Sequence, residues 1–515
     1  MQMAHRRMSS VIAFFLIWVF IPAVLWSAGL RAGAAKVSIT PDVHASKVYI
    51  AGFGSNRVST GVHDNLYARC LAIGAGHKTL VVCAADLIGI FYLDVLKVRS
   101  KVEARLPEVT QVIVASTHDH EGPDTMGLWG PGPLKSGVDL HYLNEVDNRI
   151  AEAAVQAATN MQEARMTLAR DHSPLLALLQ DDNRPPYVKD PYLFAMHLSS
   201  AATGKPIATL VNWADHPETL GSTNTQITAD YPHWLCQYVE NHGGGMALFV
   251  NGPIGGLLST LGPQVALLDP ATGQVAQDGT WEKAKLTGTM VGELAMRSLA
   301  LRGRPFSVDS LVIRKAVIDI PLSNEGFRLD AGMGVFGGSR PVYTHGRLDP
   351  TTVEKPASFL IHLVQSYSGS AVDTKAIEQQ LGGLKSAKYA TGQDLRSEVD
   401  YVELLEKKHV VAEIATVPGE IYPEIVNGGI TRYPGADFPH AAFEPTLRPH
   451  FKSEYQFVFG LANDEIGYII PKAEWDNKPP WLQNRSHRWY GEVNSVGPET
   501  AGIVTKALVR LMEGN

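Results

Sequence analysis

Strand-like apolar runs alternate with helical patterns through the first 300 residues of the chain. The runs of strand length are residues 66–75, 79–90, 111–116, 166–170, 193–199, 207–213 and 246–250. The stretches with apolar residues at a helical spacing are 94–106, 142–161, 230–241 and 281–302. This alternation favours an α/β or mixed α+β fold with layered sheets and flanking helices. No internal repeat or long linker interrupts it, so we expect one large domain over residues 35–515.

The regular pattern breaks down between Asn324 and Ser386. This stretch, residues 324–386, is rich in glycine, proline and serine and contains only short apolar pieces. Two interpretations remain open, a lid that covers a site and a plain surface insertion. Strand patterns resume at residues 410–416 and 456–459, and a helical pattern over residues 500–512 closes the chain.

The first 34 residues have the pattern of a secretory signal peptide. Two arginines at positions 6 and 7 precede an apolar run from Val11 to Trp26. Ala32-Gly33-Ala34 supplies small residues at the spacing of a cleavage site. The apolar run is short for a membrane span, so an uncleaved anchor is the less favoured alternative. We therefore predict an exported protein, periplasmic or secreted, after cleavage of residues 1–34.

The composition is that of a folded globular protein, with 45% hydrophobic and 19% charged residues. The formal net charge is −7 and no basic run stands out, so nucleic acid is a poor candidate partner. The three cysteines, Cys70, Cys83 and Cys236, are too few for a disulfide framework. Cys70 and Cys83 fall in successive predicted strands, where they either pair or remain buried thiols.

Two histidines follow directly after the predicted strand at residues 111–116. In extended backbone, residues two apart point to the same face, so His118 and His120 can serve one small site. Gly122-Pro123 then turns the chain away. Taken alone, the pair is as consistent with a hydrogen-bonded loop as with a metal site.

Three more candidate side chains stand at the ends of other predicted strands, namely His216, Glu420 and Tyr468. Each has an ordinary explanation by itself, as a hydrogen-bonded histidine, a first-turn acid or a packed tyrosine. Two imidazoles and a carboxylate together match a set of protein ligands found in catalytic zinc sites, which leave one position open for water. Other hydrolase motifs such as G-x-S-x-G and H-E-x-x-H are absent from the sequence.

The chain resembles the neutral/alkaline non-lysosomal ceramidases over most of residues 36–512. The most specific matches are the T-H-x-H-x-G-P segment ending at Pro123 and the G-L-A-N-x-x-x-G-Y segment ending at Tyr468. Further matches in the family order are residues 61–69, 84–87, 182–184, 212–217, 418–420 and 490–492. The resemblance implies a zinc-dependent amidase.

The resemblance also implies roles for particular residues. One zinc ion would be held by His118, His216, Glu420 and Tyr468. Tyr468 could alternatively donate a hydrogen bond to the developing oxyanion. His120 would be an acid/base residue or a neighbour of the metal ligands, and Arg184 and Tyr490 match positions near the scissile amide. The substrate would be an amide, or an ester, of a lipid-like or small molecule, with peripheral contact to a membrane surface as a further expectation.

Two departures from the family pattern bear on the chemistry. In the G-D-x-S segment of the family, Gly256 replaces the aspartate, Leu258 replaces the serine, and Ser259 comes one residue late. We also expect no C-terminal immunoglobulin-like domain of the kind that family members carry. The alternatives are a zinc hydrolase acting on a lactone, peptide or amino sugar, and a non-catalytic exported protein that binds a metal or ligand.

Overall fold

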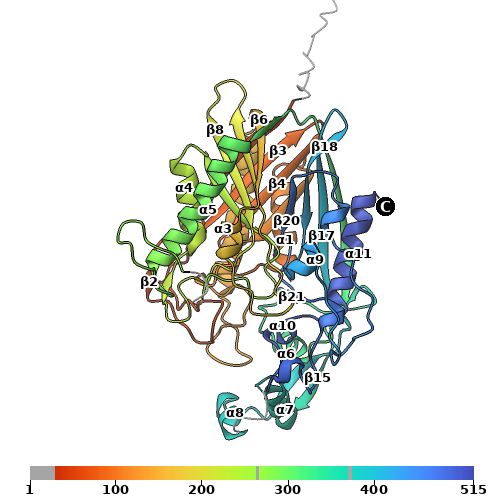
Figure 1. Ribbon diagram of the computed structural model, residues 1–515. Coiled ribbons are helices and arrows are strands. Elements are labelled where there is room, and N and C mark those ends of the chain that lie inside the picture. The colour runs from red at the N-terminus through yellow and green to blue at the C-terminus, as the bar shows by residue number, and fades with distance from the viewer. Residues whose placement is uncertain (1–28, 262–265, 369–373, 515) are drawn as a thin grey trace, which may run out of the picture.

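The structure, a computed structural model, describes residues 29–261, 266–368 and 374–514. Two large β-sheets face each other, and helices cover the outer face of each sheet (Figure 1). The predicted mixed α/β class with layered sheets and flanking helices is confirmed. Within the described residues, no helix has both the length and the apolar character that a membrane crossing requires.

The larger sheet has nine strands in the order β10-β8-β7-β6-β1-β3-β4-β5, and β11 pairs with β6. The strands are β1 (Arg31–Ser38), β3 (Tyr67–Ala75), β4 (Lys78–Ala85), β5 (Gln111–Ser116), β6 (Gln162–Asp171), β7 (Leu193–Ser200), β8 (Pro206–Trp213), β10 (Met246–Asn251) and β11 (Arg304–Phe306). The β4–β5 and β8–β10 pairs are parallel, and the other pairs are antiparallel.

The smaller sheet has six strands in the order β14-β13-β17-β18-β20, and β12 pairs with β17. Its strands are β12 (Ser310–Pro321), β13 (Tyr343–Thr344), β14 (Arg347–Leu348), β17 (Asp394–Glu406), β18 (His409–Thr416) and β20 (Gln456–Phe459). Three short pairs lie outside both sheets: β2 (Gly61–Val62) with β9 (Gln226–Ile227), β15 (Thr352–Pro356) with β16 (Ser386–Ala390), and β19 (Glu420–Ile421) with β21 (Tyr468–Ile469).

The main core lies between the two sheets. Leu71 and Ile73 of β3 belong to the same buried hydrophobic cluster as Val402 and Leu404 of β17. The alternate residues of β3 point outward, against helices. Because strands such as β3 are buried on both faces, their sequences read as continuous apolar runs.

Five helices cover the outer faces, and their burial follows the predicted apolar stripes. They are α1 (Tyr92–Glu103), α2 (Leu140–Thr159), α4 (Tyr231–Asn241), α5 (Trp281–Arg302) and α11 (Thr500–Glu513). The first four pack on the larger sheet, and α11 packs on the smaller one. In α2, Asp139 caps the first turn by accepting hydrogen bonds from the backbone N–H groups of His141 and Tyr142.

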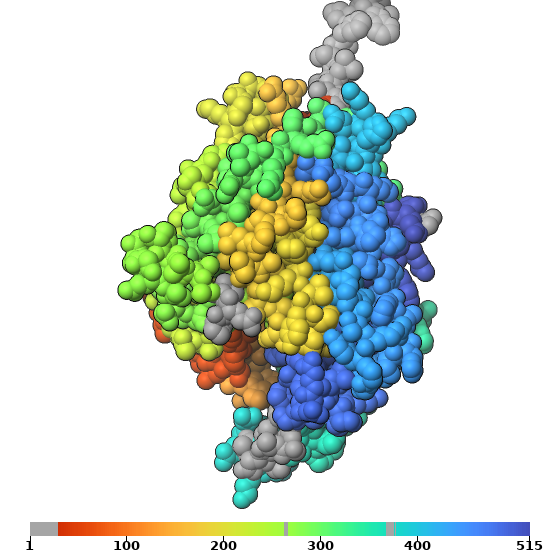
Figure 2. Space-filling model, viewed as in Figure 1, coloured from red at the N-terminus to blue at the C-terminus, as the bar shows by residue number. Residues whose placement is uncertain are grey.

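The described parts of the stretch at residues 324–386, which are 324–368 and 374–386, are folded. They contain α6 (Glu325–Met333), α7 (Ala357–Ser368), α8 (Thr374–Gln380) and three short strands, and their helices project at one end of the molecule (Figures 1 and 2). Asn324 caps α6 by accepting from Phe327 N–H, and Gly334, with a φ of 74°, ends the helix. Leu329, Leu360 and Leu363 give this segment a small core of its own.

The N-terminal prediction is described only in part, because residues 1–28 lie outside the described residues. The predicted cleavage motif lies inside β1, where Ala32 to Ala34 pair with Ile73 to Leu71 of β3. A cleavage point upstream of Arg31 would leave this strand intact.

A disulfide bond joins the two cysteines of neighbouring strands. Cys70 of β3 and Cys83 of β4 stand opposite each other in register and are bonded, whereas Cys236 is a buried free thiol. Of the two possibilities that the sequence left open, the structure has the pair.

Candidate active site

The predicted site residues come from four separate strand ends. His118 and His120 follow β5, and His216 follows β8, both in the larger sheet. Glu420 lies in β19 just after β18 of the smaller sheet, and Tyr468 lies in β21 after β20. The parallel pairing of β19 with β21 sets Glu420 directly beside Tyr468. The strand-end argument from the sequence therefore describes how the site is assembled.

Buried amides tie these strand ends together. The Asn251 amide, at the end of β10, donates to the carbonyls of Thr117 and Asp215. The Asn212 amide donates to the carbonyl of Val458 in the other sheet, at 3.0 Å. The loops that carry the two histidines are thus hydrogen-bonded to the rigid sheets, which suits a site that needs fixed geometry.

Backbone carbonyls orient two of the histidines. The Nδ1 atom of His118 lies 2.8 Å from the carbonyl oxygen of Ile88, and that of His216 lies 2.9 Å from the carbonyl oxygen of Leu258. A carbonyl can only accept, so Nδ1 carries the proton in both rings and Nε2 is the nitrogen turned toward the site. Histidines that bind metals are commonly held in this way. His118 also has a positive φ of 68°, an uncommon backbone conformation that often marks functional positions.

The Nε2 atoms of the two histidines converge on one carboxylate oxygen. The Oε2 atom of Glu420 lies 3.0 Å from His216 Nε2 and 3.6 Å from His118 Nε2. Tetrahedral zinc with bonds of ~2.0–2.1 Å holds its ligand atoms roughly 3.3 Å apart. The three groups and Tyr468, which hydrogen-bonds Glu420, are all buried. The donor set and its spacing therefore fit a zinc ion.

Burial and mutual charge keep this site ready to bind a cation. Burial lowers the pKa of His118 to about 4, so its imidazole is neutral at physiological pH. Burial alone would raise the pKa of Glu420, but His118 and His216 outweigh it and lower the pKa overall. Metal ligands must be deprotonated, and His118 and Glu420 meet that condition. Burial alone would lower the pKa of His216, but its hydrogen bond to Glu420 and the charges of Glu218 and Glu420 raise it overall, so a bound metal ion would displace a proton from this ring.

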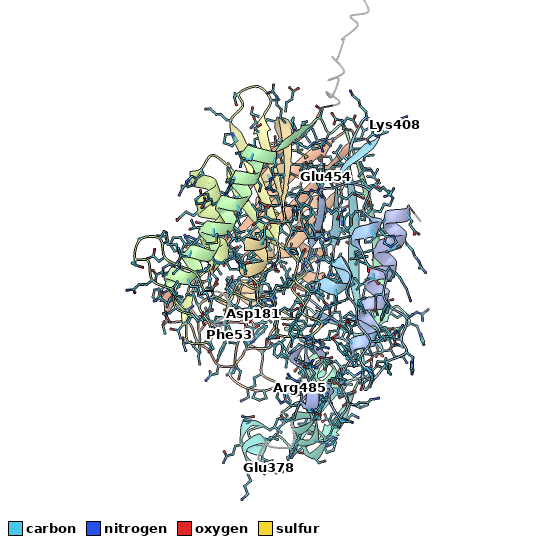
Figure 3. The ribbon with its side chains drawn as sticks, in the orientation of Figure 1. Phe53, Asp181, Glu378, Lys408, Glu454 and Arg485 are labelled. Carbon is cyan, nitrogen blue, oxygen red and sulfur yellow. A yellow bond between two sulfur atoms is a disulfide. The ribbon has the colours of Figure 1, made fainter. Side chains whose placement is uncertain are left out.

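His120 differs from the other two histidines. Neither of its ring nitrogens has a hydrogen-bond partner among the described residues, and its backbone carbonyl accepts from Arg57. Its ring lies 4.8 Å from the ring of His118, and Phe53, labelled in Figure 3, packs edge-on at 5.3 Å. One ring nitrogen from each of His118, His120 and His216 lies within 4.8 Å of the others. His120 is therefore free for proton transfer and close enough to be a third nitrogen ligand.

The structure adds Glu218, which the sequence interpretation missed. Its Oε2 lies 3.4 Å from His120 Nδ1, and its carboxylate accepts from the Ser259 side chain. Ser259 is held in place by a backbone pair with Asp181, also labelled in Figure 3. Ser259, which comes one residue later than the family serine, is thus linked to the site by its contact with Glu218. The sequence feature that could have indicated Glu218 is its position two residues after His216, a candidate ligand.

Arg184 and Tyr490 are placed differently from each other. The guanidinium of Arg184 makes a forked ion pair with Glu492 at 2.6 and 2.7 Å, and the rings of Tyr422 and Trp489 lie against it. Arg184 is not among the described residues that line the cavity at the histidines, whereas Tyr490 lines it and is 51% exposed. The structure brings Tyr490 to the candidate site and buries Arg184 behind it.

An apolar cavity opens onto the candidate metal ligands. Its volume is about 60 Å³, and His118, His120, Glu420 and Tyr468 belong to its polar lining, together with Arg340, Glu465, Tyr490 and Asn494. Its other walls are mostly apolar and include Ile88, Phe91, Met126, Leu128, Trp129, Phe327 and Phe336. Phe327 and Phe336 belong to residues 324–386, so this segment forms part of the cavity wall. A polar centre beside apolar walls suits a substrate whose reacting bond adjoins a hydrocarbon group.

Comparison with known proteins supplies a fold relationship. No family model and no curated protein matches the chain in sequence. The neutral ceramidase from Pseudomonas aeruginosa matches in structure with a TM-score of 0.62 and 17% identity, over 94% of this chain and 75% of that chain. A ceramidase complexed with C2 matches with a TM-score of 0.63 and 17% identity, over 94% of this chain and 76% of that one. The chain therefore has the fold of the neutral ceramidases, the family that its sequence motifs resemble.

Proposed function

We propose that the protein is a zinc-dependent hydrolase that cleaves the amide bond of a lipid-like substrate. The observation that carries the proposal is the convergence of His118 Nε2, His216 Nε2 and Glu420 Oε2, with separations of 3.0 and 3.6 Å, at the wall of an apolar cavity. The ceramidase fold supports amide hydrolysis as the reaction class. The apolar walls support a substrate that carries hydrocarbon.

Zinc bound by His118, His216, Glu420 and Tyr468 would polarise the substrate carbonyl and lower the pKa of water toward ~7. His120 then accepts a proton from the attacking water and delivers it to the amine nitrogen as the C–N bond breaks. Its unpartnered ring nitrogens and the nearby Glu218 carboxylate suit this exchange. Tyr490, at the exposed side of the cavity, is a hydroxyl donor for the substrate carbonyl oxygen.

Export to the periplasm or the medium is part of the proposal. The apolar N-terminal segment from Val11 to Trp26 has the pattern of a signal peptide. The Cys70–Cys83 disulfide adds support, because disulfides persist mainly in oxidising compartments.

A hydrolysis assay with and without a chelator tests the function. Zinc-loaded protein should release amine from N-acyl amide reporters, lose this activity when zinc is removed, and regain it when zinc is restored. Glu420→Gln should lose activity, while Glu354→Gln, which changes an exposed acid on β15, should retain it. Full turnover after complete zinc removal would refute the metal mechanism. A zinc-loaded protein that cleaves no amide would refute the amidase proposal.

A further inference from the structure

A second, larger apolar cavity lies beside the candidate active site. It has a volume of about 330 Å³ and is bounded by α6, by α7, by Leu381 just after α8, and by the loop at residues 127–135. Its apolar walls include Leu134, Leu329, Leu360, Leu363 and Val364, and we call it the outer groove. Three of these leucines form the small core of residues 324–386. The outer groove is therefore built mainly by a segment to which the proposed chemistry assigns no role.

The outer groove adjoins the catalytic cavity. Leu128 lines both spaces. Gly326 lines the outer groove and its neighbour Phe327 lines the catalytic cavity. In the same way, Val335 lines the outer groove and Phe336 lines the catalytic cavity. The rings of Phe327 and Phe336 meet edge to face at 6.0 Å. The partition between the two spaces is thus formed by the side chains of Leu128, Phe327 and Phe336.

The two cavities differ in volume, and the difference suggests which part of a lipid-like substrate each one binds. A catalytic cavity of about 60 Å³ holds the reacting bond and little more, because sites that bury a small molecule are typically ~300–1,000 Å³. The outer groove, at about 330 Å³, reaches that range. Its polar lining residues are Ser55, Lys135 and Asp330, and the rest of its wall is glycine, proline, leucine or valine. The mostly aliphatic wall favours a hydrocarbon chain over a polar chain.

We propose that the outer groove binds an unbranched alkyl chain of the substrate, which passes over Leu128, Phe327 and Phe336 from the scissile amide. This inference rests on the proposed amidase function. It assigns to residues 324–386 the role of recognising chain length. Burial of each methylene group would raise kcat/KM by up to about fourfold until the groove is filled.

Chain-length kinetics test the proposal. Two series of amides are compared, one with the acyl chain lengthened from two to sixteen carbons and one with the amine chain lengthened in the same way. In one of the two series, kcat/KM should rise with length and then level off, and that series identifies the chain that occupies the groove. The two-carbon member of each series measures the catalytic site alone.

Val364→Trp, which fills the outer groove, should lower kcat/KM for a twelve-carbon chain by at least about tenfold and leave the two-carbon amide unchanged. Val364→Glu provides a second variant in case the first fails to fold. Val353→Trp is the matched control, since Val353 lies in the same segment, is 44% exposed and is not among the described lining residues of either cavity. A flat chain-length profile in both series, or an equal effect of Val364→Trp on short and long chains, would overturn the proposal.

Binding separates this proposal from the proposed function. Calorimetry uses dodecanamide, whose chain is on the acyl side, and N-dodecylacetamide, whose chain is on the amine side. At least one of them should bind to the wild-type protein with an affinity that weakens at least about tenfold in Val364→Trp and not in Val353→Trp. If no amide is cleaved while this difference in binding persists, the amidase function fails and the groove assignment stands. If short amides are cleaved and both twelve-carbon probes bind equally to all three proteins, the groove assignment fails alone.

Discussion

The imidazole of His120 faces the carboxylate of Glu218, with 3.4 Å between Nδ1 and Oε2. Glu218 is itself held by the Ser259 side chain and lies two residues beyond the candidate ligand His216. The Glu218 carboxylate thus lies between His120 and Ser259. The ring nitrogens of His120 have no hydrogen-bond partner among the described residues. This connection gives Glu218 a positioning role toward His120.

Glu218→Gln should lower kcat by about 10–100-fold, the usual effect of removing a residue that orients a metal-site group, while zinc remains bound. The amide keeps the side-chain volume but replaces the carboxylate that faces His120 Nδ1. Steady-state kinetics and zinc content of the same preparation measure the two effects, and Glu218→Asp should recover part of the activity. Glu325→Gln, at the exposed first turn of α6, is the control. Unchanged kcat in Glu218→Gln would contradict the role.

Substitution of the candidate ligands should separate metal binding from proton transfer. His118→Ala, His216→Ala and Glu420→Ala should each purify with less than stoichiometric zinc, because each removes one converging donor atom. His120→Ala should retain zinc and lose roughly 10²–10⁴-fold in rate. Elemental analysis beside amide kinetics measures both properties, with exposed His44→Ala as the control. Zinc loss in His120→Ala would instead show that the three-histidine cluster is the ligand set.

Arg184 should be needed for stability rather than for substrate affinity. Removing its guanidinium leaves the buried Glu492 carboxylate without its ion-pair partner, which typically costs about 3–5 kcal/mol. Arg184→Ala should therefore unfold at a clearly lower urea concentration, and Arg184→Lys should recover part of the loss. The KM of properly folded Arg184→Lys should stay near the wild-type value. A large rise in KM without loss of stability would instead support the position near the scissile amide that the family resemblance implies.

The buried acid Asp147 should make stability depend on pH. Burial, with a contribution from Asp94, raises the pKa of Asp147 from its ordinary value of 3.8 to about 7. The folded state therefore holds this proton more tightly than the unfolded state does. Stability is greatest when the carboxyl is protonated, and it falls as the pH rises from about 4 through about 7.

Asp147→Asn should therefore be more stable than the wild type at pH 8 and lose that advantage at acidic pH, with an upper bound of about 4 kcal/mol. Urea unfolding of both proteins between pH 5 and pH 8 measures the difference, and comparison of the two proteins cancels the contributions of other titrating groups. Exposed Glu108→Gln, between α1 and β5, is the control. An equal pH dependence in the wild type and in Asp147→Asn would contradict the assignment.

The sequence predicted the elements whose burial produces a clear periodicity, and it missed those whose buried positions are polar. Strands β5 and β8 and helix α5 were predicted within one residue of their observed bounds. The long β12–β17 pair was not predicted, because β17 buries three acids, Glu398, Asp400 and Glu403, at positions where apolar residues would signal a strand. Strand β1 was assigned in part to the signal peptide because its small residues fit a cleavage motif.

The site shows the same division. His118, His216, Glu420 and Tyr468 could be predicted because each directly follows a recognisable strand, and the structure brings them together. Glu218 and the burial of Arg184 could not be predicted, since both depend on which side chains meet across distant loops. The choice between a disulfide and buried thiols for Cys70 and Cys83 depended on strand register, which the apolar pattern does not specify.

The origin of the candidate ligands in two different sheets has a thermodynamic consequence. His118 and His216 extend from the larger sheet, while Glu420 and Tyr468 follow strands of the smaller one. A cation held by all four would act as a clamp between the sheets, and its binding free energy would add directly to the cohesion of the core between them. Zinc affinity would then depend on how firmly the two sheets pack together. A substitution in the core between the sheets would weaken zinc binding without changing a ligand.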